Sequence, residues 1–270
     1  MTGAGRHPGG AWPWRAALVT GASSGIGEAT ARCLAAGGVT HLVLVARRRD
    51  RLAALAEALA PAGVTSEVLV ADLASGAGCE TVERRLAAPG GPPLDLVVND
   101  AAAGSGGPFL AGDPDQHEAL IHLNVVALTR LTRAALGPMV ERGRGAVLNV
   151  SSMVAYYPPP GSATYAASKA YVTHLSEALH EEVRGTGVTV TAVLPGFTRA
   201  PMAASTRGVP GFAWLEPDAV ARAGLEAAAR GRALCIPGAP YRAAAALVTP
   251  LPRSARRWLA GRVAGRFSDA

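Results

Sequence analysis

Short runs of β-branched apolar residues alternate with longer stretches rich in alanine and leucine along most of this chain. The short runs are typical of buried strands, and the long stretches repeat apolar residues with the period of a helix. The expected strands are 17–20, 41–46, 67–71, 94–99, 145–151, 188–194 and 233–236, and the expected helices are 25–36, 50–60, 114–139, 162–184 and 216–230. Strands that alternate with helices pair in parallel through right-handed crossovers. The pattern predicts one α/β domain with a doubly wound parallel sheet in three layers, α/β/α.

Composition agrees with one domain and argues against several classes of protein. The chain has 270 residues, of which 49% are hydrophobic, so it can bury a sizeable core. The net charge is +6, but residues 251–270 hold five arginines and one aspartate, so the rest of the chain is near neutral. A high pI of this origin does not indicate nucleic-acid binding, and we expect none. Cys33, Cys79 and Cys235 match no metal-ligand spacing, which indicates a reducing, cytoplasmic compartment and no metal.

The two ends of the chain differ from its body. Residues 1–14 are rich in glycine and proline and lack a continuous apolar stretch, so we expect a flexible tail and no signal peptide. We expect no apolar run to reach the length needed to span a bilayer. Residues 241–270 form a basic tail that we expect to be helical. This tail has three interpretations: weak contact with an anionic membrane surface, docking on a partner subunit, or a solvated helix.

A glycine-rich turn follows the first expected strand. From Thr20 to Gly27 the sequence reads T-G-A-S-S-G-I-G, and a helix follows. Glycines let the backbone bend sharply and let a pyrophosphate approach, and the helix N-terminus offers N–H groups to phosphates. A plain tight turn is the alternative. The residues that this turn would bring to a dinucleotide are Gly21, Ser23, Ser24, Gly25, Ile26 and Gly27.

The end of the second expected strand bears on the choice of dinucleotide. An acidic residue there would bind the ribose 2′-hydroxyl, whereas an arginine accommodates a 2′-phosphate. Ala46 stands at the acidic position, and Arg47 and Arg48 follow it. NADP(H) is therefore favoured over NAD(H). Alternatively, the two arginines belong to a solvated helix start and pair with Asp50.

Tyr165 and Lys169 lie four residues apart in an expected helix, so they share one face. Lys169 is the chain's one lysine among 26 basic residues. An ammonium beside a tyrosine favours the phenolate, so we expect Lys169 to lower the pKa of Tyr165. Tyr165 would then exchange a proton near neutral pH. An ordinary exposed pair is the alternative.

The T-G-x-x-x-G-x-G turn and the Y-x-x-x-K pair together resemble the short-chain dehydrogenase/reductase family, in its compact single-domain branch. The resemblance covers residues 15–240. It implies a Rossmann-like fold and an NAD(P)-dependent oxidoreductase. Such an enzyme transfers a hydride to a ketone or aldehyde, or from the matching secondary alcohol, with Tyr165 as acid/base. The resemblance also favours a homo-oligomer acting on a small carbonyl or alcohol substrate.

Two more residues complete a catalytic tetrad by this resemblance. Ser152 lies thirteen residues before Tyr165 and would stabilise the carbonyl oxygen, although Ser151 is adjacent and a strand-end serine often only caps a turn. Asn124 lies twenty-eight residues before Ser152, inside an expected helix that asparagine disfavours. It resembles the family's asparagine that interrupts a helix and holds a water in a proton relay to Lys169. A solvent-facing polar residue is the alternative.

The resemblance implies further cofactor contacts. They are Asp72 and Leu73 at the adenine, Asn99 and Ala101 after the fourth strand, and Pro195, Gly196 and Thr198 at the nicotinamide, together with Tyr165 and Lys169. Asp72 can equally cap the segment that follows it. The sequence also departs from the family pattern. Asn99-Asp100-Ala101-Ala102 stands where the family has Asn-Asn-Ala-Gly, and Ala200 stands where a threonine is frequent, so Thr198 is a substitute.

The expected substrate region is apolar. Residues 197–216 are predicted to form a flexible lid, and with Met153, Val154, Tyr156 and Tyr157 they favour a bulky lipophilic ketone or aldehyde. Alternatively, these apolar side chains only pack on the body. His122, His174 and His180 share no triad or metal spacing and are interpreted as structural. Two rival functions remain open: a non-catalytic dinucleotide-binding sensor or scaffold, and a sugar epimerase or dehydratase.

Overall fold

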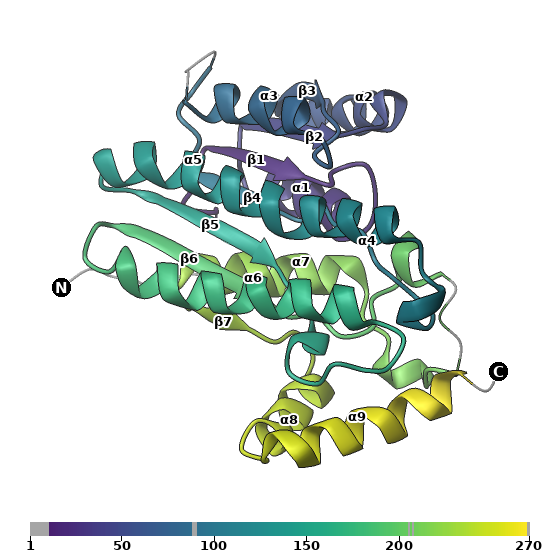
Figure 1. Ribbon diagram of the computed structural model, residues 1–270. Helices are drawn as coiled ribbons and strands as arrows, with labels where there is room; N and C mark the ends of the chain where they lie inside the picture. The colour runs from purple at the N-terminus through teal and green to yellow at the C-terminus, as the bar shows by residue number, and fades with distance from the viewer. Residues whose placement is uncertain (1–10, 88–90, 205, 207, 269–270) are drawn as a thin grey trace.

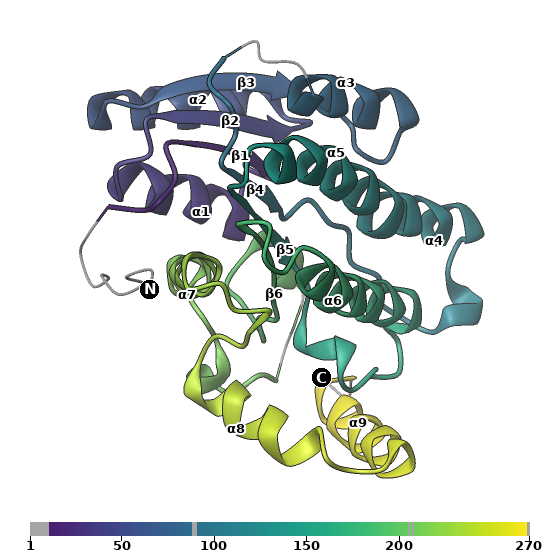
Figure 2. The same cartoon turned by 90° about the vertical axis from the view of Figure 1, so that its left-hand side faces the viewer.

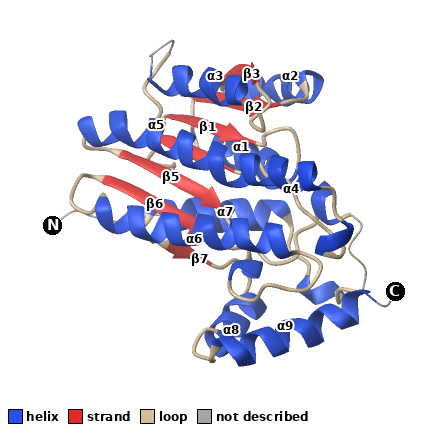
Figure 3. Cartoon of the chain, in the orientation of Figure 1, coloured by secondary structure: helices blue, strands red, loops and turns tan. Residues whose placement is uncertain are grey.

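A computed structural model describes residues 11–87, 91–204, 206 and 208–268 and contains one parallel sheet of seven strands (Figures 1 and 3). The strand order is β3-β2-β1-β4-β5-β6-β7, which confirms the predicted doubly wound α/β fold. The strands are β1 (Ala16–Thr20), β2 (His41–Ala46), β3 (Thr65–Val70), β4 (Leu96–Asn99), β5 (Gly145–Val150), β6 (Val188–Val193) and β7 (Leu234–Cys235). Strand β1 pairs with both β2 and β4, so the order reverses there. Ligands of such sheets bind at this reversal, beyond the carboxyl ends of the strands.

Helices cover both faces of the sheet (Figure 2). One face carries α1 (Gly25–Ala36), α2 (Arg49–Leu59) and α7 (Pro217–Ala229), and the other carries α3 (Gly76–Ala87), α5 (Leu128–Glu141) and α6 (Ala163–Glu182). Successive residues of β1 enter different cores: Val19 packs towards α1, and Leu18 packs towards α5. This alternation follows from the pleat of a strand, and it makes the central strands apolar on both faces.

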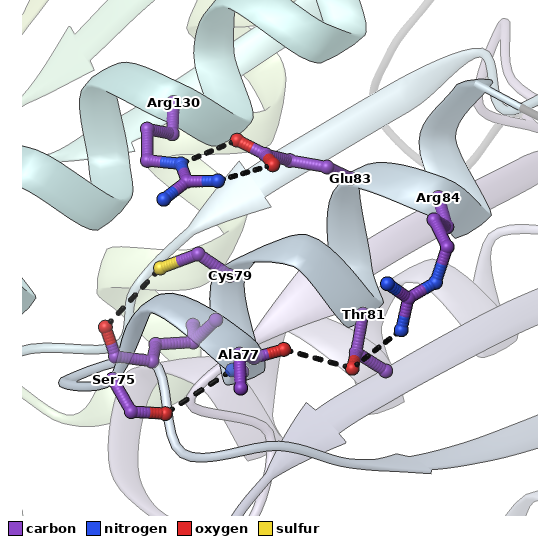
Figure 4. Close-up of polar contacts among 9 residues, drawn as sticks. Ser75, Ala77, Cys79, Thr81, Glu83, Arg84 and Arg130 are labelled. Carbon is purple, nitrogen blue, oxygen red and sulfur yellow. Dashed lines mark hydrogen bonds and ion pairs between the residues drawn. The ribbon is translucent and has the colours of Figure 1, made fainter.

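Helix α3 is not among the helices expected from the sequence. Gly76 and Gly78 at its start are poor helix formers, which hides its apolar periodicity. The helix is anchored to α5 by Arg130, whose Nε and Nη2 donate to the two carboxylate oxygens of Glu83, both at 2.7 Å (Figure 4). This bidentate ion pair fixes α3, the helix that follows β3, against α5.

A continuous helical rod runs from Pro114 to Glu141. It consists of α4 (Pro114–Ile121), a π-helical turn (His122–Ala127) and α5. By length and composition this rod qualifies as a membrane span, so the expectation that no segment is long enough was wrong. Its inner residues Leu131, Ala135 and Met139 lie in the core against the sheet, which is the position of a core helix.

The C-terminal residues form two helices, as expected of a helical tail. They are α8 (Ala239–Val248) and α9 (Arg253–Ser268), and they lie together beyond β7 (Figure 1). Tyr241 and Ala245 of α8 pack into a small core with Met153, Ala192 and Leu194. The segment is therefore joined to the domain at the sheet edge nearest the expected substrate region.

The flexible tail expected for residues 1–14 is wrong for residues 11–14, and residues 1–10 lie outside the described residues. Trp12 and Trp14 are buried and stack with ring centroids 5.9 Å apart. The Trp12 Nε1 donates to the carbonyl of Cys33 at 3.0 Å. A Cβ at Gly37 would come within 2.1 Å of the Trp12 ring, so this glycine makes room for it.

We expect Trp12→Ala to lower the free energy of unfolding by about 3–5 kcal/mol, the usual loss when a large buried aromatic is truncated. Trp258→Ala is the matched control, because this ring is 59% exposed. It is expected to cost less than about 1 kcal/mol. Urea unfolding followed by far-UV circular dichroism measures both. If Trp12→Ala lowered the free energy of unfolding no more than the small amount expected for Trp258→Ala, Trp12 would contribute no core packing.

Candidate active site

The turn between β1 and α1 can form only with glycine at several positions. Gly21 and Gly25 have φ angles of 70° and 61°, in the left-handed region. A Cβ at Gly27 would come within 2.5 Å of the Gly21 carbonyl oxygen. The Ser24 side chain does not cap the start of α1, and among the first N–H groups of the helix that of Gly27 donates to the Asp100 carboxylate, so the N–H groups of Gly25 and Ile26 are the ones available to an anion. The turn has the shape and the donors that a dinucleotide pyrophosphate requires.

Arg48 is fixed on this turn. Its guanidinium donates to the hydroxyls of Ser23 and Ser24, both at 2.9 Å from Nη2, and to the Ser23 carbonyl at 3.2 Å. Arg47 is exposed. Among the described residues neither arginine pairs with Asp50, so the structure favours a cofactor-side position for Arg48 over the solvated alternative. The structure thus places Arg48 beside the glycine turn, and the contact of both arginines with the cofactor stays a prediction.

Tyr165, Lys169 and Ser152 meet at the carboxyl end of β5. Tyr165 and Lys169 project from the same face of α6, and the Lys169 Nζ lies 5.7 Å from the centre of the Tyr165 ring. The Nζ donates to the carbonyl of Val150 at 2.8 Å, and the lysine is buried. The hydroxyls of Tyr165 and Ser152 are hydrogen-bonded. The pair is therefore not an ordinary exposed one.

The electrostatics of this group differ from the expectation. Burial raises the pKa of Tyr165, the Asp100 carboxylate raises it further, and the bond with Ser152 opposes both. The prediction that Lys169 lowers this pKa was therefore wrong, because desolvation dominates. Burial also lowers the pKa of Lys169 to about 8, although the charge of Asp100 opposes this. At neutral pH Tyr165 thus carries its proton, which is the form that a proton donor needs.

The two adjacent serines have different surroundings. The Ser151 hydroxyl is buried, donates to the Lys169 carbonyl at 2.8 Å and contacts the Thr173 hydroxyl at 2.7 Å. It joins β5 to α6. The Ser152 hydroxyl accepts from the Val154 N–H at 3.3 Å and also faces Tyr165. Ser152 thus both caps a turn and belongs to the reactive group, whereas Ser151 is structural.

Asn124 lies in the π-helical turn and is 1% exposed, so the solvent-facing alternative is wrong. Its Oδ1 accepts from the Ala103 N–H at 2.8 Å, and its Nδ2 donates to the Ala103 carbonyl at 2.9 Å. The Nδ2 also donates to the Ser168 hydroxyl at 3.0 Å, one residue before Lys169. The π-turn turns this side chain towards α6 and the loop after β4.

Other predicted cofactor residues have side chains that are already engaged. The Asn99 Nδ2 donates to Thr132 and Asn149 in the core, so Asn99 is a structural hydrogen-bonder, and its contact with the cofactor stays a prediction. The Leu73 side chain is also buried in the core. The Asp72 carboxylate accepts from the Ala74 N–H at 3.1 Å, so the capping role is present. Ala101 lies beside the glycine turn, because its backbone nitrogen is 2.9 Å from the position that a Cβ on Gly21 would take.

The segment after β6 begins with Pro195 and Gly196. Gly196 faces the Tyr241 ring so closely that a Cβ there would come within 1.9 Å. The Tyr241 hydroxyl accepts from the Phe197 N–H at 3.0 Å and donates to the Ala213 carbonyl at 2.6 Å. The Thr198 hydroxyl donates back to the Gly196 carbonyl at 3.1 Å. Ala200 lies against the glycine turn, 3.1 Å from the place of a Cβ at Gly25.

The described part of segment 197–216 is apolar towards the domain and also on its surface. Phe197 packs on Trp214, with ring centroids 5.9 Å apart, and joins the core that contains Met153, Tyr156 and Tyr157. Some large apolar side chains near this segment are exposed. They are Met202 at 52%, Phe212 at 78%, and, in the loop after β4, Phe109 at 58% and Leu110 at 96%.

Three histidines predicted to be structural have structural contacts. His174 and His180 bond the carbonyls of Ala170 and Val190, both at 2.8 Å, and His122 lies 3.9 Å from Glu118. His117 was missed by the sequence analysis. Its Nδ1 lies 2.9 Å from the hydroxyl of Thr164, the residue before Tyr165. No spacing in the sequence marks this contact, which arises from packing of α4 on α6. No cluster of metal-ligating side chains occurs among the described residues.

A glycine turn at the switch point of a parallel sheet, facing a tyrosine, a lysine and a serine, is the site of a dinucleotide-dependent oxidoreductase. The sequence model of the family described as short chain dehydrogenase matches residues 15–209, and the chain belongs to this family. It is therefore an oxidoreductase of the class that acts on carbonyl and alcohol groups.

Three relatives illustrate its similarities. The very-long-chain 3-oxoacyl-CoA reductase of Anas platyrhynchos is 34% identical over 88% of this chain and 77% of its own. The structure of a short-chain dehydrogenase from Sphingobium yanoikuyae in complex with NADPH is 35% identical, with a TM-score of 0.76 over 88% of this chain and 97% of that chain. The bulky-bulky ketone specific alcohol dehydrogenase from Comamonas testosteroni is 31% identical, with a TM-score of 0.75 over 89% and 96%.

Proposed function

We propose that the protein is an NADP(H)-dependent reductase of bulky, mainly apolar ketones or aldehydes, and that it also oxidises the matching secondary alcohols. One observation carries this proposal. The Tyr165 hydroxyl, hydrogen-bonded to Ser152 and near Lys169, lies at the carboxyl edge of a sheet whose glycine turn fits a dinucleotide.

Each residue of the site has its own role in the proposed reduction. The nicotinamide, when bound, supplies the hydride for reduction. The Ser152 hydroxyl holds the substrate oxygen beside Tyr165, and Tyr165 gives this oxygen its proton. Lys169 is close enough to stabilise the phenolate that remains. Asn124 fixes the Ala103 backbone and bonds Ser168, so it keeps the loop after β4 and helix α6 in register.

The preference for NADP(H) is argued from Arg48. A guanidinium fixed beside Ser23 and Ser24 matches the bidentate geometry of a phosphate. The Sphingobium relative was solved in complex with NADPH, which supports the same choice here.

Arg48→Ala is expected to weaken NADPH binding by about 10- to 100-fold, since hydrogen bonds to charged groups contribute about 1.5–3 kcal/mol. NADH binding should change much less, because NADH has no 2′-phosphate. Fluorescence titration of both nucleotides gives the ratio. Arg47→Ala is the matched control from the neighbouring position. A larger loss with Arg47→Ala would assign the 2′-phosphate to Arg47 instead.

The substrate class is argued from the apolar surroundings of the site. Phe197 and Trp214 pack together, and Met202 lies over the loop after β4, 3.5 Å from the place of a Cβ at Gly104. Two relatives act on extended acyl chains or bulky ketones by name, which supports a large apolar substrate.

The proposal is tested by NADPH oxidation against a panel of bulky ketones, aldehydes and quinones. Turnover that increases with the apolar size of the ketone would support it. If the protein binds NADPH but turns over only small polar carbonyls, the substrate class is wrong. If it neither binds NADPH nor turns over any carbonyl, the scaffold alternative takes its place.

A further inference from the structure

Asp100 occupies an unusual position behind the glycine turn. Its Oδ2 lies 2.7 Å from the place of a Cβ at Gly27 and 3.0 Å from the place of one at Gly21. The Gly27 N–H donates to this carboxylate. The Asp100 N–H donates to the Thr20 hydroxyl at 3.0 Å, which fixes the start of the loop. A carboxylate is thus built into the same turn that would hold the cofactor's phosphates.

The charged groups that face Asp100 come from one element. Lys169 and Tyr165, both on α6, interact with it electrostatically. The turn contributes only the Gly27 N–H, and the Thr20 hydroxyl of β1 is directed to the Val98 carbonyl at 3.3 Å. No salt bridge to Asp100 occurs within the described residues, so its negative charge is only partly balanced.

This environment makes the protonation state of Asp100 adjustable. Burial raises the pKa of Asp100 to about 7, although the Lys169 ammonium and the Gly27 N–H both lower it. Near neutral pH the carboxyl group is therefore close to half protonated. A negative ligand on the turn repels the carboxylate but not the neutral acid.

We propose that Asp100 takes up a proton when the pyrophosphate of the cofactor binds the glycine turn, so that the affinity for NADP(H) falls as the pH rises. This inference rests on the proposed function, since it needs a dinucleotide at the turn. The sign follows from linkage: binding favours the protonated acid, so affinity is highest where Asp100 is already protonated. An asparagine here, as in the family pattern, would be neutral at every pH.

The test is the dissociation constant of NADPH between pH 6 and pH 8.5, measured by fluorescence titration. For the natural chain it should rise by at least about fivefold, since one linked proton changes affinity by up to about tenfold per pH unit. Asp100→Asn should reduce this rise to less than about twofold. Asp50→Asn, which removes an exposed carboxylate, should keep it. Titration of the 2′-phosphate is common to all variants and cancels in the comparison.

Lys169 needs its own control, because its pKa of about 8 lies in the same range. Lys169→Met should keep the pH dependence, displaced to higher pH, because Asp100 then loses its neighbouring cation. Lys169→Met combined with Asp100→Asn should abolish it. Calorimetry at pH 7 in two buffers of different ionisation enthalpy should show that Lys169→Met takes up more protons on binding NADPH than the double variant does, since the contribution of the 2′-phosphate is the same in both.

The outcomes separate the inference from the function on which it rests. If NADPH binds with a pH dependence that Asp100→Asn leaves unchanged, the inference is overturned and the proposed function stands. If NADPH binds at no pH, both are overturned.

Discussion

Replacing Tyr165 by phenylalanine is expected to reduce carbonyl turnover by about 10²- to 10⁴-fold, the usual contribution of a positioned proton donor. The change removes only the hydroxyl that bonds Ser152 and leaves the ring beside Lys169. NADPH affinity and the melting temperature should therefore stay close to those of the natural chain. Steady-state kinetics with NADPH and a bulky ketone measure the loss.

Tyr171→Phe is the matched control for this experiment. Tyr171 lies on the same helix but is 40% exposed, and its hydroxyl contacts Thr129 at 3.0 Å. Its loss should leave turnover unchanged. If Tyr165→Phe kept more than about a tenth of the turnover, the loss would be smaller than general acid catalysis predicts. Another group would then have to donate the proton.

The second large effect is expected at Gly27. A methyl group there meets the Gly21 carbonyl oxygen at 2.5 Å and the Asp100 Oδ2 at 2.7 Å, so the turn must open. Gly27→Ala should weaken NADPH binding by more than about tenfold, since the third glycine permits close packing of helix and strand under the pyrophosphate. Fluorescence titration measures the affinity.

Gly76→Ala is the control, because a Cβ at this helical glycine meets nothing within 4 Å. Thermal unfolding by circular dichroism distinguishes a damaged site from an unfolded chain. A Gly27→Ala variant that stays folded and binds NADPH normally would show that the turn does not hold the pyrophosphate.

The sequence was sufficient for the sheet and its crossovers, because strand and helix periods are local signals. The predictions from the sequence were wrong where the packing of a few side chains overrides the local composition. Trp12 and Trp14 stand among glycine and proline, yet their indoles are buried in the core. Gly76 and Gly78 weaken the helical signal of α3, whose stability comes from packing and the Arg130 contact.

At the site, spacing located the reactive residues but not their electrostatics. The four-residue interval places Tyr165 and Lys169 on one face, which the structure shows. The direction of the Tyr165 pKa depends on burial and on Asp100, which belongs to a loop sixty-five residues earlier. The roles of Arg47 and Arg48 depend on which guanidinium turns back to the serines, and adjacent positions in a sequence do not reveal that.

Tyr241 ties the segment after β6 to the C-terminal helix α8. This one side chain of α8 bonds backbone atoms at Phe197 and Ala213, which lie near the two ends of segment 197–216. Helix α8 therefore anchors this segment, whereas Tyr165 projects from α6 and the glycine turn follows β1. A substitution at Tyr241 therefore changes how the segment after β6 is held and leaves the side chains of Tyr165, Lys169 and Ser152 in place.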